Sequence, residues 1–486
     1  MSSTVTSTDK PFSRDDTRFI GHPLGLAWLS ACELWERFSY YGMQILLALY
    51  LTKYLFQPEH IGNVMGIGAI RAGIEHFLGP RTPLQLGLFI AGQYSGLVYL
   101  TPILGGLVAD RLLGRTRTVV LGASLMAIGH FMMAFEASFF IAIACLLVGV
   151  GCFKGNIAAQ VGALYAPGDK RNATAFQIFI MAVQIAVIAA PIVCGTLGEK
   201  VGFHWGFGAA GIGMLIGLAT YLAGRGWLPP EPARKGGADV VEQPPLTRAE
   251  IRRVGVLILL LPVLLVAVIG NTQLNLGFTV WSDKHMDLMM FGWQVPVTWL
   301  SMVDAVVSTI TGLASIAFWL WWSKRRTEPD ELTKMALGSV VAAAGPAAMA
   351  VAGAIVDTTH GRVGPVWTLA FTLLNDIGFS NVYAISLALY SRVAPRQITG
   401  LVVGIYFLHL WGAFSVAGWL AGFMDAWSNR DFWALHALLV LVGAVLLFVA
   451  RMAFGRLLST ETLAAERAAA DAAGARADEP ALVPAH

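Results

Sequence analysis

Charged residues are scarce in this sequence of 486 residues. Asp, Glu, Lys and Arg together make up 13% of it, whereas ordinary globular domains carry about 25%. Hydrophobic residues make up 56%, and the mean hydropathy is +0.65. A soluble protein with this composition would expose large apolar patches and aggregate. The composition therefore excludes an ordinary soluble enzyme or binding domain and indicates a chain that is embedded in lipid.

Cysteine is also rare, and each cysteine lies inside an apolar stretch: Cys32, Cys145, Cys152 and Cys194. This placement matches neither a disulfide framework nor a metal-ligand cluster, so we predict no metal and no other cofactor. The net charge is only +3, with the basic residues in loops, so we do not expect nucleic acid as a partner. The first 23 residues are polar and lack the pattern of a cleaved signal peptide.

Long hydrophobic stretches, in contrast, recur along the whole chain. Averaging over a window of about 19 residues places twelve apolar spans at 25–52, 85–110, 118–135, 138–163, 174–198, 205–224, 254–281, 297–322, 334–357, 364–391, 398–426 and 432–457. An apolar stretch of about 20 residues is long enough to cross a bilayer as a helix. The predicted fold is therefore an all-α polytopic membrane protein with twelve transmembrane helices.

Basic residues are distributed unequally among the loops. The loops after spans 2, 4, 8 and 10 carry clusters of Lys and Arg, whereas the alternate loops mostly carry single ones. Short loops that are rich in Lys and Arg stay in the cytoplasm. We therefore expect a protein of the cytoplasmic (inner) membrane with both termini in the cytoplasm.

One long polar stretch, residues 225–253, separates six spans from six and is rich in Pro and Gly. This layout is typical of transporters that are built from two related halves. We therefore predict an N-terminal half over 24–224, a cytoplasmic linker over 225–253 and a C-terminal half over 254–457. The segments 1–23 and 458–486 are predicted to lie in the cytoplasm.

A second unusual stretch, residues 57–84, is predicted to form an insertion on the outer (periplasmic) side. Apolar residues recur in it at helical spacing: Val64, Ile67, Ile70, Ile74 and Phe77. This spacing predicts a short helix that lies at the membrane interface.

Span 1 carries three ionisable residues, Glu33, Glu36 and Arg37. Their spacing of i, i+3 and i+4 places them on one helical face. A charge within a span costs at least about 2.5–3.5 kcal/mol, so these groups must face the interior of the bundle. Arg37 can pair with one ionised carboxylate while the other gains a proton readily. The alternative is a structural ion pair, but a single pair would suffice for that. We therefore predict a proton-coupling site at these three residues.

The stretch Glu33-x-x-Glu36-Arg37-Phe-x-Tyr40-Tyr41-Gly42 resembles the signature of the proton-coupled oligopeptide transporter family within the major facilitator superfamily. Five further stretches also match: Tyr99-Leu-Thr-Pro102-Ile-Leu-Gly105-Gly106, Asp110-Arg111, Gly151-Cys-Phe153-Lys154-Gly-Asn156, Gly195-Thr-Leu-Gly198-Glu199 and Ala394-Pro395. The resemblance implies the major facilitator fold, with two six-helix halves, and proton-driven uptake of di- and tripeptides.

The resemblance also implies roles for single residues. Lys154 would bind the substrate carboxylate and couple it to the proton site, and Arg37, Tyr40 and Tyr99 would line the substrate cavity. The alternative for Lys154 is a side chain that snorkels to the cytoplasm, but it lies about ten residues from the next loop. Asp110 and Arg111 would close a cytoplasmic gate rather than touch the substrate.

Several positions depart from the family's pattern. In span 5 a cavity tyrosine is replaced by Ile180 and an asparagine by Gln184, and in span 7 the family's Glu-Gln pair reads Thr272-Gln273. Phe379 stands in span 10 where the family has the glutamate associated with the peptide's amino end, and Phe414 replaces an asparagine in span 11. The second half has therefore lost much of the peptide signature. Gln184 and Gln273 stay candidates for substrate binding.

Two other acids of the second half are candidates to replace these lost groups. Asp376 lies in mid-span 10, nearly on the face of Phe379, and Asp304 lies in span 8. Either could receive a cationic group or pair with Lys154. For Asp304 the alternative is a water-exposed residue near a helix end. His409 in span 11 could titrate near neutral pH, but a lone histidine in a span is more often a hydrogen-bonded packing residue.

The sequence thus predicts a monomeric proton-coupled symporter for peptides or peptide-like substrates, which moves them by alternating access. A family member that transports a modified peptide or another small organic anion is the first alternative, because the glutamates of spans 7 and 10 are missing. A membrane sensor that binds without transport is the second. An enzyme is not expected, since no nucleophile or metal constellation is present.

Overall fold

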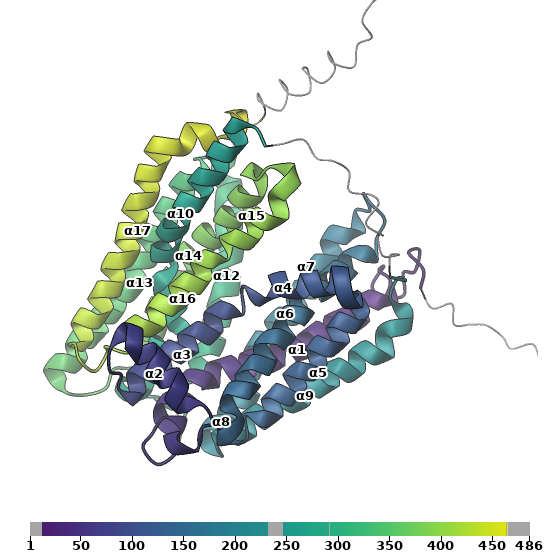
Figure 1. The fold of residues 1–486 in the computed structure, drawn as a ribbon. Helices are drawn as coiled ribbons and strands as arrows, with labels where there is room; N and C mark the ends of the chain where they lie inside the picture. The colour runs from purple at the N-terminus through teal and green to yellow at the C-terminus, as the bar shows by residue number, and fades with distance from the viewer. Residues whose placement is uncertain (1–11, 232–245, 291, 463, 465–486) are drawn as a thin grey trace, which may run out of the picture.

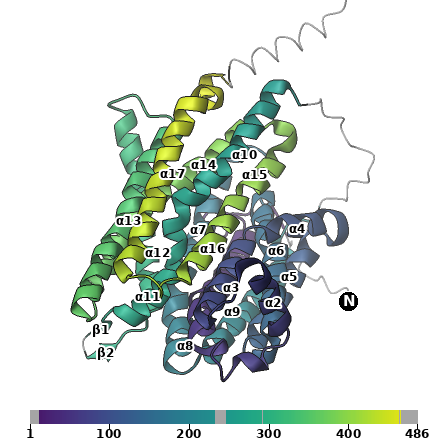
Figure 2. The same cartoon turned by 60° about the vertical axis from the view of Figure 1, so that its left-hand side comes forward.

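The computed structural model describes residues 12–231, 246–290, 292–462 and 464 of the chain. Most of these residues are helical (Figure 1). Among them, strands occur only in one antiparallel hairpin, which pairs β1 (Met289–Met290) with β2 (Trp293–Gln294). Figure 2 shows this hairpin beside α11, away from the end of the bundle where α10 begins. The predicted all-α fold is confirmed.

Nine α-helices precede the linker in residues 12–231: α1 (Leu24–Tyr50), α2 (Ile67–Leu78), α3 (Pro83–Leu97), α4 (Thr101–Val108), α5 (Arg115–Met132), α6 (Phe139–Ala163), α7 (Arg171–Ala190), α8 (Thr196–Lys200) and α9 (Phe203–Gly224). In the described part of the chain, eight follow it: α10 (Arg248–Thr272), α11 (Gly277–His285), α12 (Trp299–Ser323), α13 (Glu331–Thr359), α14 (Val366–Val393), α15 (Thr399–Tyr406), α16 (Leu408–Ala421) and α17 (Asn429–Leu458).

These helices form twelve membrane-length segments in the described residues, six before and six after the linker. Eight segments pass a test of length and hydropathy on their own, and a ninth is the pair α3 and α4, whose axes are bent by 41°. The other three are α1, α5 and α14. Charged residues lower the mean hydropathy of each of them. Those of α1 and α14 include the buried Glu33, Glu36 and Asp376, whereas those of α5 are Arg115 and Arg117 in its first turn.

Three spans that the sequence predicts as continuous helices are interrupted. The span 85–110 breaks between α3 and α4, and the span 398–426 breaks at Phe407, between α15 and α16. The span 254–281 breaks at the 3₁₀ turn Gln273–Asn275, between α10 and α11. Broken helices are tolerated at membrane depth where protein or water satisfies the freed backbone groups.

The two halves meet at one end of the bundle and diverge toward the other. We call the end where α9 stops and α10 begins the linker end, and the opposite end the far end. α3 packs against α16 near the far end, whereas α4 and α15, the linker-end parts of the same spans, do not pack extensively on one another. Figure 1 shows the separation of the halves toward the linker end.

The contact between α3 and α16 depends on glycine. A Cβ atom on Gly92 would lie 2.5 Å from the carbonyl oxygen of Phe414 and 3.1 Å from the Cα of Gly418. Such distances are shorter than van der Waals contact, so a larger residue would push the helices apart. Small residues let membrane helices approach closely, and here they join the two halves.

The insertion at 57–84 contains the predicted helix, now placed as α2. Ile67, Ile70, Ile74 and Phe77 lie on it, but Val64 precedes it and is buried, with 3% of its surface exposed. Val64 therefore packs into the core and does not continue the apolar stripe of the helix. The predicted linker at 225–253, terminal segment at 1–23 and tail at 458–486 fall partly on residues 232–245, 1–11, 463 and 465–486, which lie outside the described part of the chain.

Candidate functional site

Glu33, Glu36 and Arg37 lie together on α1, and at most 5% of any of them is exposed. The Nε of Arg37 donates to Oε2 of Glu36 at 2.5 Å, and its Nη2 donates to Oε1 of the same carboxylate at 2.9 Å. The contact with Glu33 is weaker: Nε lies 3.1 Å from its Oε1. The other oxygen of Glu33, Oε2, is buried without a hydrogen-bond partner in the described residues. Arg37 is thus bonded more closely to Glu36 than to Glu33.

The next turn of α1 adds an aromatic residue to this cluster. The guanidinium carbon of Arg37 lies 5.2 Å from the centroid of the Tyr40 ring, and that ring packs edge-to-face on Tyr41 at 5.0 Å. A cation over a tyrosine ring is stabilised when the pair is shielded from water. Tyr40 therefore helps to fix the position of the arginine head group.

Lys154 projects from α6 onto the ring of Tyr99. Its Nζ lies 5.1 Å from the ring centroid, within the range of a cation–π contact. Lys154 forms no ion pair with the described residues, although Glu33, Glu36 and Arg37 are close enough to act on its charge. An ammonium group without a fixed carboxylate partner is able to receive one from a ligand.

Tyr99 in turn stacks on the other half of the protein. Its ring lies 5.9 Å from the ring of Phe414 and 6.2 Å from that of Phe407, at interplanar angles of 18° and 21°. Phe414 is one of the departures from the family's pattern, and it extends an aromatic surface beneath Lys154. No local sequence pattern predicts this contact, because it joins residues from opposite halves.

Asp304 and Asp376 come together between α12 and α14. Their carboxyl groups are within hydrogen-bonding range of each other, and Asp304 also acts on Tyr41 of α1 across the interface of the halves. Only 2% of Asp376 is exposed. Its Oδ1 accepts a 3.2 Å hydrogen bond from Asn375, while its Oδ2 has no partner in the described residues. We call these two residues the acid pair.

The two glutamines differ in their surroundings. Gln184 of α7 donates to the hydroxyl of Thr309 on α12, so it bridges the two halves. Gln273 is fully buried within the second half. Its amide nitrogen donates to Ala417 O at 3.0 Å and lies 2.7 Å from Nε2 of His436, and its oxygen accepts from Gly277 N at 3.0 Å. The amide of Gln273 thus holds the break between α10 and α11.

Three more predicted positions also make internal contacts. The hydroxyl of Thr272 donates to the carbonyl of Ile269 at 2.9 Å, and the ring of Phe379 stacks on Tyr383 at 5.3 Å. His409 lies with its Nδ1 2.5 Å from the carbonyl oxygen of Tyr406. This local contact agrees with the packing role that the sequence favoured for His409.

Polar contacts join the halves at the far end. Lys53 Nζ pairs with the carboxylate of Asp283 at 2.9 Å, and both oxygens of Glu199 accept backbone N–H groups, from Val297 and Thr298, at 2.9 Å. Sequence reasoning missed these roles, although Lys53 and Asp283 are opposite charges at the far ends of two spans. We call this set of contacts the far-end clasp.

Asp110 and Arg111 lie at the linker end, in the π turn Ala109–Leu113, and both side chains are exposed. They form no ion pair with the described residues, which fits the separation of the halves at this end. Nearby, Glu231 accepts a 2.6 Å hydrogen bond from the backbone N–H of Thr116 in the first turn of α5. A carboxylate at a helix N-terminus is stabilising, and no local sequence pattern predicts this contact.

Comparison with known proteins gives a consistent result. The profile of the POT family matches residues 116–243 and 240–436. A peptide transporter of Yersinia enterocolitica, YePEPT, is 30% identical over 83% of this chain and 87% of its own length. A di-/tripeptide transporter of Lactococcus lactis subsp. cremoris is 26% identical over 90% of this chain and 97% of its own length.

A solved structure shares the fold as well. The crystal structure of the peptide transporter POT in complex with sulfate superposes with a TM-score of 0.76 at 26% identity. The match covers 90% of this chain and 96% of the other. The arrangement of the helical segments thus belongs to a fold that is already known from crystals.

Proposed function

Because this chain belongs to the POT family, we propose that it is a proton-coupled symporter that imports di- and tripeptides or peptide-like molecules by alternating access. One observation carries the proposal: the buried cluster of Glu33, Glu36 and Arg37, with Lys154 close enough to act on its charge. Ionisable groups at membrane depth are expensive and mark transport or proton pathways.

The charges of these four residues supply a coupling mechanism. With both glutamates ionised, two negative and two positive charges balance. When a proton binds Glu33, which is held more weakly than Glu36, the cluster carries one positive charge. An anionic substrate group then restores neutrality, because an uncompensated charge in a buried site is unfavourable. Proton binding and carboxylate binding therefore favour each other.

Two regions would hold the ends of the substrate. Lys154 is placed to take the carboxylate, with Tyr40 and Tyr99 as neighbouring walls. The acid pair, Asp304 and Asp376, is placed to receive a cationic group from the other half. Gln184, which bridges α7 and α12 through Thr309, would contribute an amide at the interface of the halves. We leave Gln273 out of the substrate site, since its amide is already bonded within the second half.

Three residues of the second half bear on which molecule is carried. Thr272 and Phe379 stand in place of two family glutamates, and Phe414 adds an apolar ring beneath Lys154. This pattern favours, as a second candidate, a modified peptide or another small organic anion with an aromatic or apolar part. The acid pair decides between the candidates, because only a substrate with a cationic end needs it.

Alternating access would come from rocking of the half at 24–224 against the half at 254–457. The far-end clasp would seal the outer side, and Asp110 and Arg111 would help to close the linker end when the clasp opens. We place the linker end and both termini in the cytoplasm of a cell with an inner membrane, on the distribution of basic loops. Each inward-moving charge then gains about 2.3 kcal/mol per 100 mV of membrane potential. The protein would act as a monomer surrounded by lipid, with no catalytic role.

Uptake into proteoliposomes tests the proposal. An inward proton gradient should drive concentrative uptake of a dipeptide or peptide-like substrate, and a protonophore should abolish it. A panel of peptides and organic acids, scored by substrate-dependent acidification of the lumen, would identify the substrate class. Uptake that ignores the proton gradient for every substrate in the panel would refute symport.

A further inference from the structure

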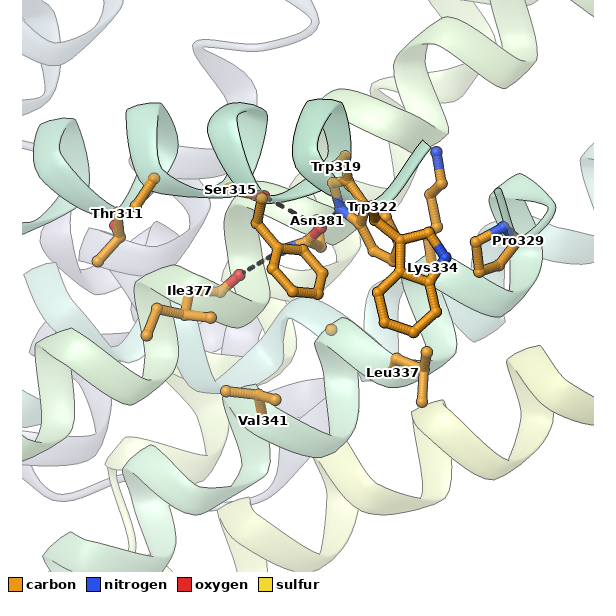
Figure 3. A pocket seen from close by; sticks show the side chains of 13 residues that line it. Thr311, Ser315, Trp319, Trp322, Pro329, Lys334, Leu337, Val341, Ile377 and Asn381 are labelled. Carbon is orange, nitrogen blue, oxygen red and sulfur yellow. Dashed lines mark hydrogen bonds between the residues drawn. The ribbon is translucent and has the colours of Figure 1, made fainter. Parts of the chain in front are cut away.

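A groove separate from the site lies between three helices of the second half. It encloses about 440 Å³ between α12, α13 and α14, a volume within the range of small-molecule sites. Figure 3 shows its side chains, with Trp319 and Trp322 from α12 facing Leu337 and Val341 of α13. α12 and α13 each pack on α14 but not extensively on one another, so the groove lies between them.

The polar groups deep in the groove are already bonded to one another. Asn381 Oδ1 accepts from Trp319 Nε1 at 2.6 Å and from Ser315 Oγ at 3.1 Å, and its Nδ2 donates to Ile377 O at 2.7 Å. The rest of the wall is mainly aromatic and aliphatic. An occupant therefore needs no hydrogen bonds from this wall, and a hydrocarbon chain fits it better than a polar solute.

The rim of the groove faces the membrane. Phe318 and Leu337 line it with 46% and 53% of their surfaces exposed. Exposed apolar side chains on membrane-spanning helices contact lipid, since burial against protein is not available to them. A lipid chain can therefore enter the groove sideways from the bilayer without crossing water.

The mouth of the groove at the linker end carries positive charge. Arg325 lies 4.7 Å from the ring centroid of Trp321, and Arg326 lies 5.2 Å from that of Trp322, which lines the groove. The acids nearby have partners already: Glu328 pairs with Lys334, Asp330 with Arg451 and Glu331 with Arg392. Within the described residues no carboxylate pairs with Arg325 or Arg326.

We propose that this groove binds one phospholipid with an anionic headgroup. One acyl chain lies between α12 and α13 against Trp319 and Val341, and the headgroup phosphate contacts Arg325 and Arg326. Basic groups beside helices on the cytoplasmic side attract anionic headgroups, and each buried methylene of the chain adds hydrophobic stabilisation. Arginine suits a phosphate because its planar fork donates two parallel hydrogen bonds.

Native mass spectrometry of the full-length protein tests this proposal, with phosphatidylglycerol and phosphatidylcholine added at equal concentration. The wild type should retain one phosphatidylglycerol in preference to phosphatidylcholine. The double variant Arg325→Gln/Arg326→Gln should lose this preference, with affinity for phosphatidylglycerol falling roughly tenfold or more. Val341→Trp should fill the groove and reduce retention of both lipids.

Lys170→Gln provides the matched control. Lys170 is exposed at the same end of the molecule but lies in the first half, away from the groove, so its loss should not change lipid retention. Equal retention of phosphatidylglycerol by the wild type, the double arginine variant and Val341→Trp would overturn the proposal. The proposal would also be overturned if the protein retained glycerol phosphate alone in place of the lipid. A measured mass that corresponds to a second copy of the chain in place of lipid would overturn it as well.

Discussion

Arg37 holds Glu36 with two hydrogen bonds of 2.5 and 2.9 Å but meets Glu33 in a single contact of 3.1 Å. Both carboxylates lie on the same helix and are almost completely buried. This difference in bonding assigns different functions to the two carboxylates, which the sequence alone does not distinguish. Glu36 keeps the arginine in place, and Glu33, with one oxygen free, is the better proton carrier.

Glu33→Gln should therefore abolish concentrative uptake and leave folding intact. The neutral amide mimics the protonated acid, so downhill exchange of substrate across the membrane should continue. The measurement is a pair of proteoliposome assays, one with an imposed proton gradient and one for counterflow at equal pH. Full concentrative uptake by Glu33→Gln would remove this residue from the coupling step.

Glu36→Gln provides the contrast. It removes the partner of a buried guanidinium, and breaking a buried ion pair typically costs about 3–5 kcal/mol. Glu36→Gln should therefore lower the midpoint of thermal unfolding in detergent clearly more than Glu33→Gln does. Equal decreases of the unfolding midpoint in the two variants would show that the unequal bonding of the carboxylates does not affect stability.

Lys154→Ala should raise the half-saturating concentration of substrates that carry a carboxylate. The cavity would lose the ammonium group that rests on Tyr99, while the aromatic stack with Phe414 would stay. Competition assays with an acid and its amide separate charge from packing, because the amide should bind wild type and variant about equally. An equal loss of affinity for both ligands would assign Lys154 a structural role.

The residues that sequence reasoning could group together lie within two turns of one helix or carry a charge in an apolar span. Glu33, Glu36 and Arg37 were predicted together because a spacing of three and four residues fixes their neighbours in any helix. Lys154 stood out for the same reason as any charge at membrane depth, namely its cost there. For such residues, local geometry and composition are enough.

What the sequence did not show depends on contacts between distant residues. Lys53 and Asp283 are 230 residues apart, and nothing in either local stretch predicts their pairing. The bonding of Gln273 to Ala417 and His436 is of the same kind. A residue that matches a family's binding position can thus be bonded internally instead, and only the folded structure reveals it.

Gln273→Ala should accordingly affect stability more than affinity. The substitution leaves Gly277 N and Ala417 O without their partners in a buried region, and each buried polar group left unpaired costs about 1–3 kcal/mol. Thermal unfolding should shift down while the half-saturating concentration of substrate stays close to that of the wild type. A large change in affinity with no change in stability would return Gln273 to the substrate site.

The far-end clasp makes a prediction about conformation. Glu199→Ala removes both acceptors of the N–H groups of Val297 and Thr298, and hydrogen bonds to a charged group are worth about 1.5–3 kcal/mol. The population should shift toward a state that is open at the far end. Spin labels at Glu59 and Arg362, which are exposed at this end, should report longer distances in the variant.

Lys53→Gln is the control for that experiment. Half of the lysine side chain is exposed, and exposed ion pairs contribute about 0–1 kcal/mol. Its effect on the distance distribution should be smaller than that of Glu199→Ala. A larger effect for Lys53→Gln would mean that the ion pair, and not the carboxylate of Glu199, holds the clasp closed.

The acid pair gives the test that separates the two candidate functions. Asp376 lies almost fully buried with one oxygen unpaired, and Asp304 is its neighbour within hydrogen-bonding range. Two such carboxyl groups repel when both are ionised, so a substrate ammonium group stabilises them. If dipeptides are carried, Asp376→Asn should reduce their affinity far more than that of N-acetylated analogues, and Asp304→Asn should do the same to a smaller extent. If the substrate is a purely anionic molecule, dipeptides should neither compete nor drive proton entry, and both variants should bind that substrate normally. Dipeptide transport that is unchanged in both variants would remove the acid pair from the substrate site while leaving peptide transport itself standing.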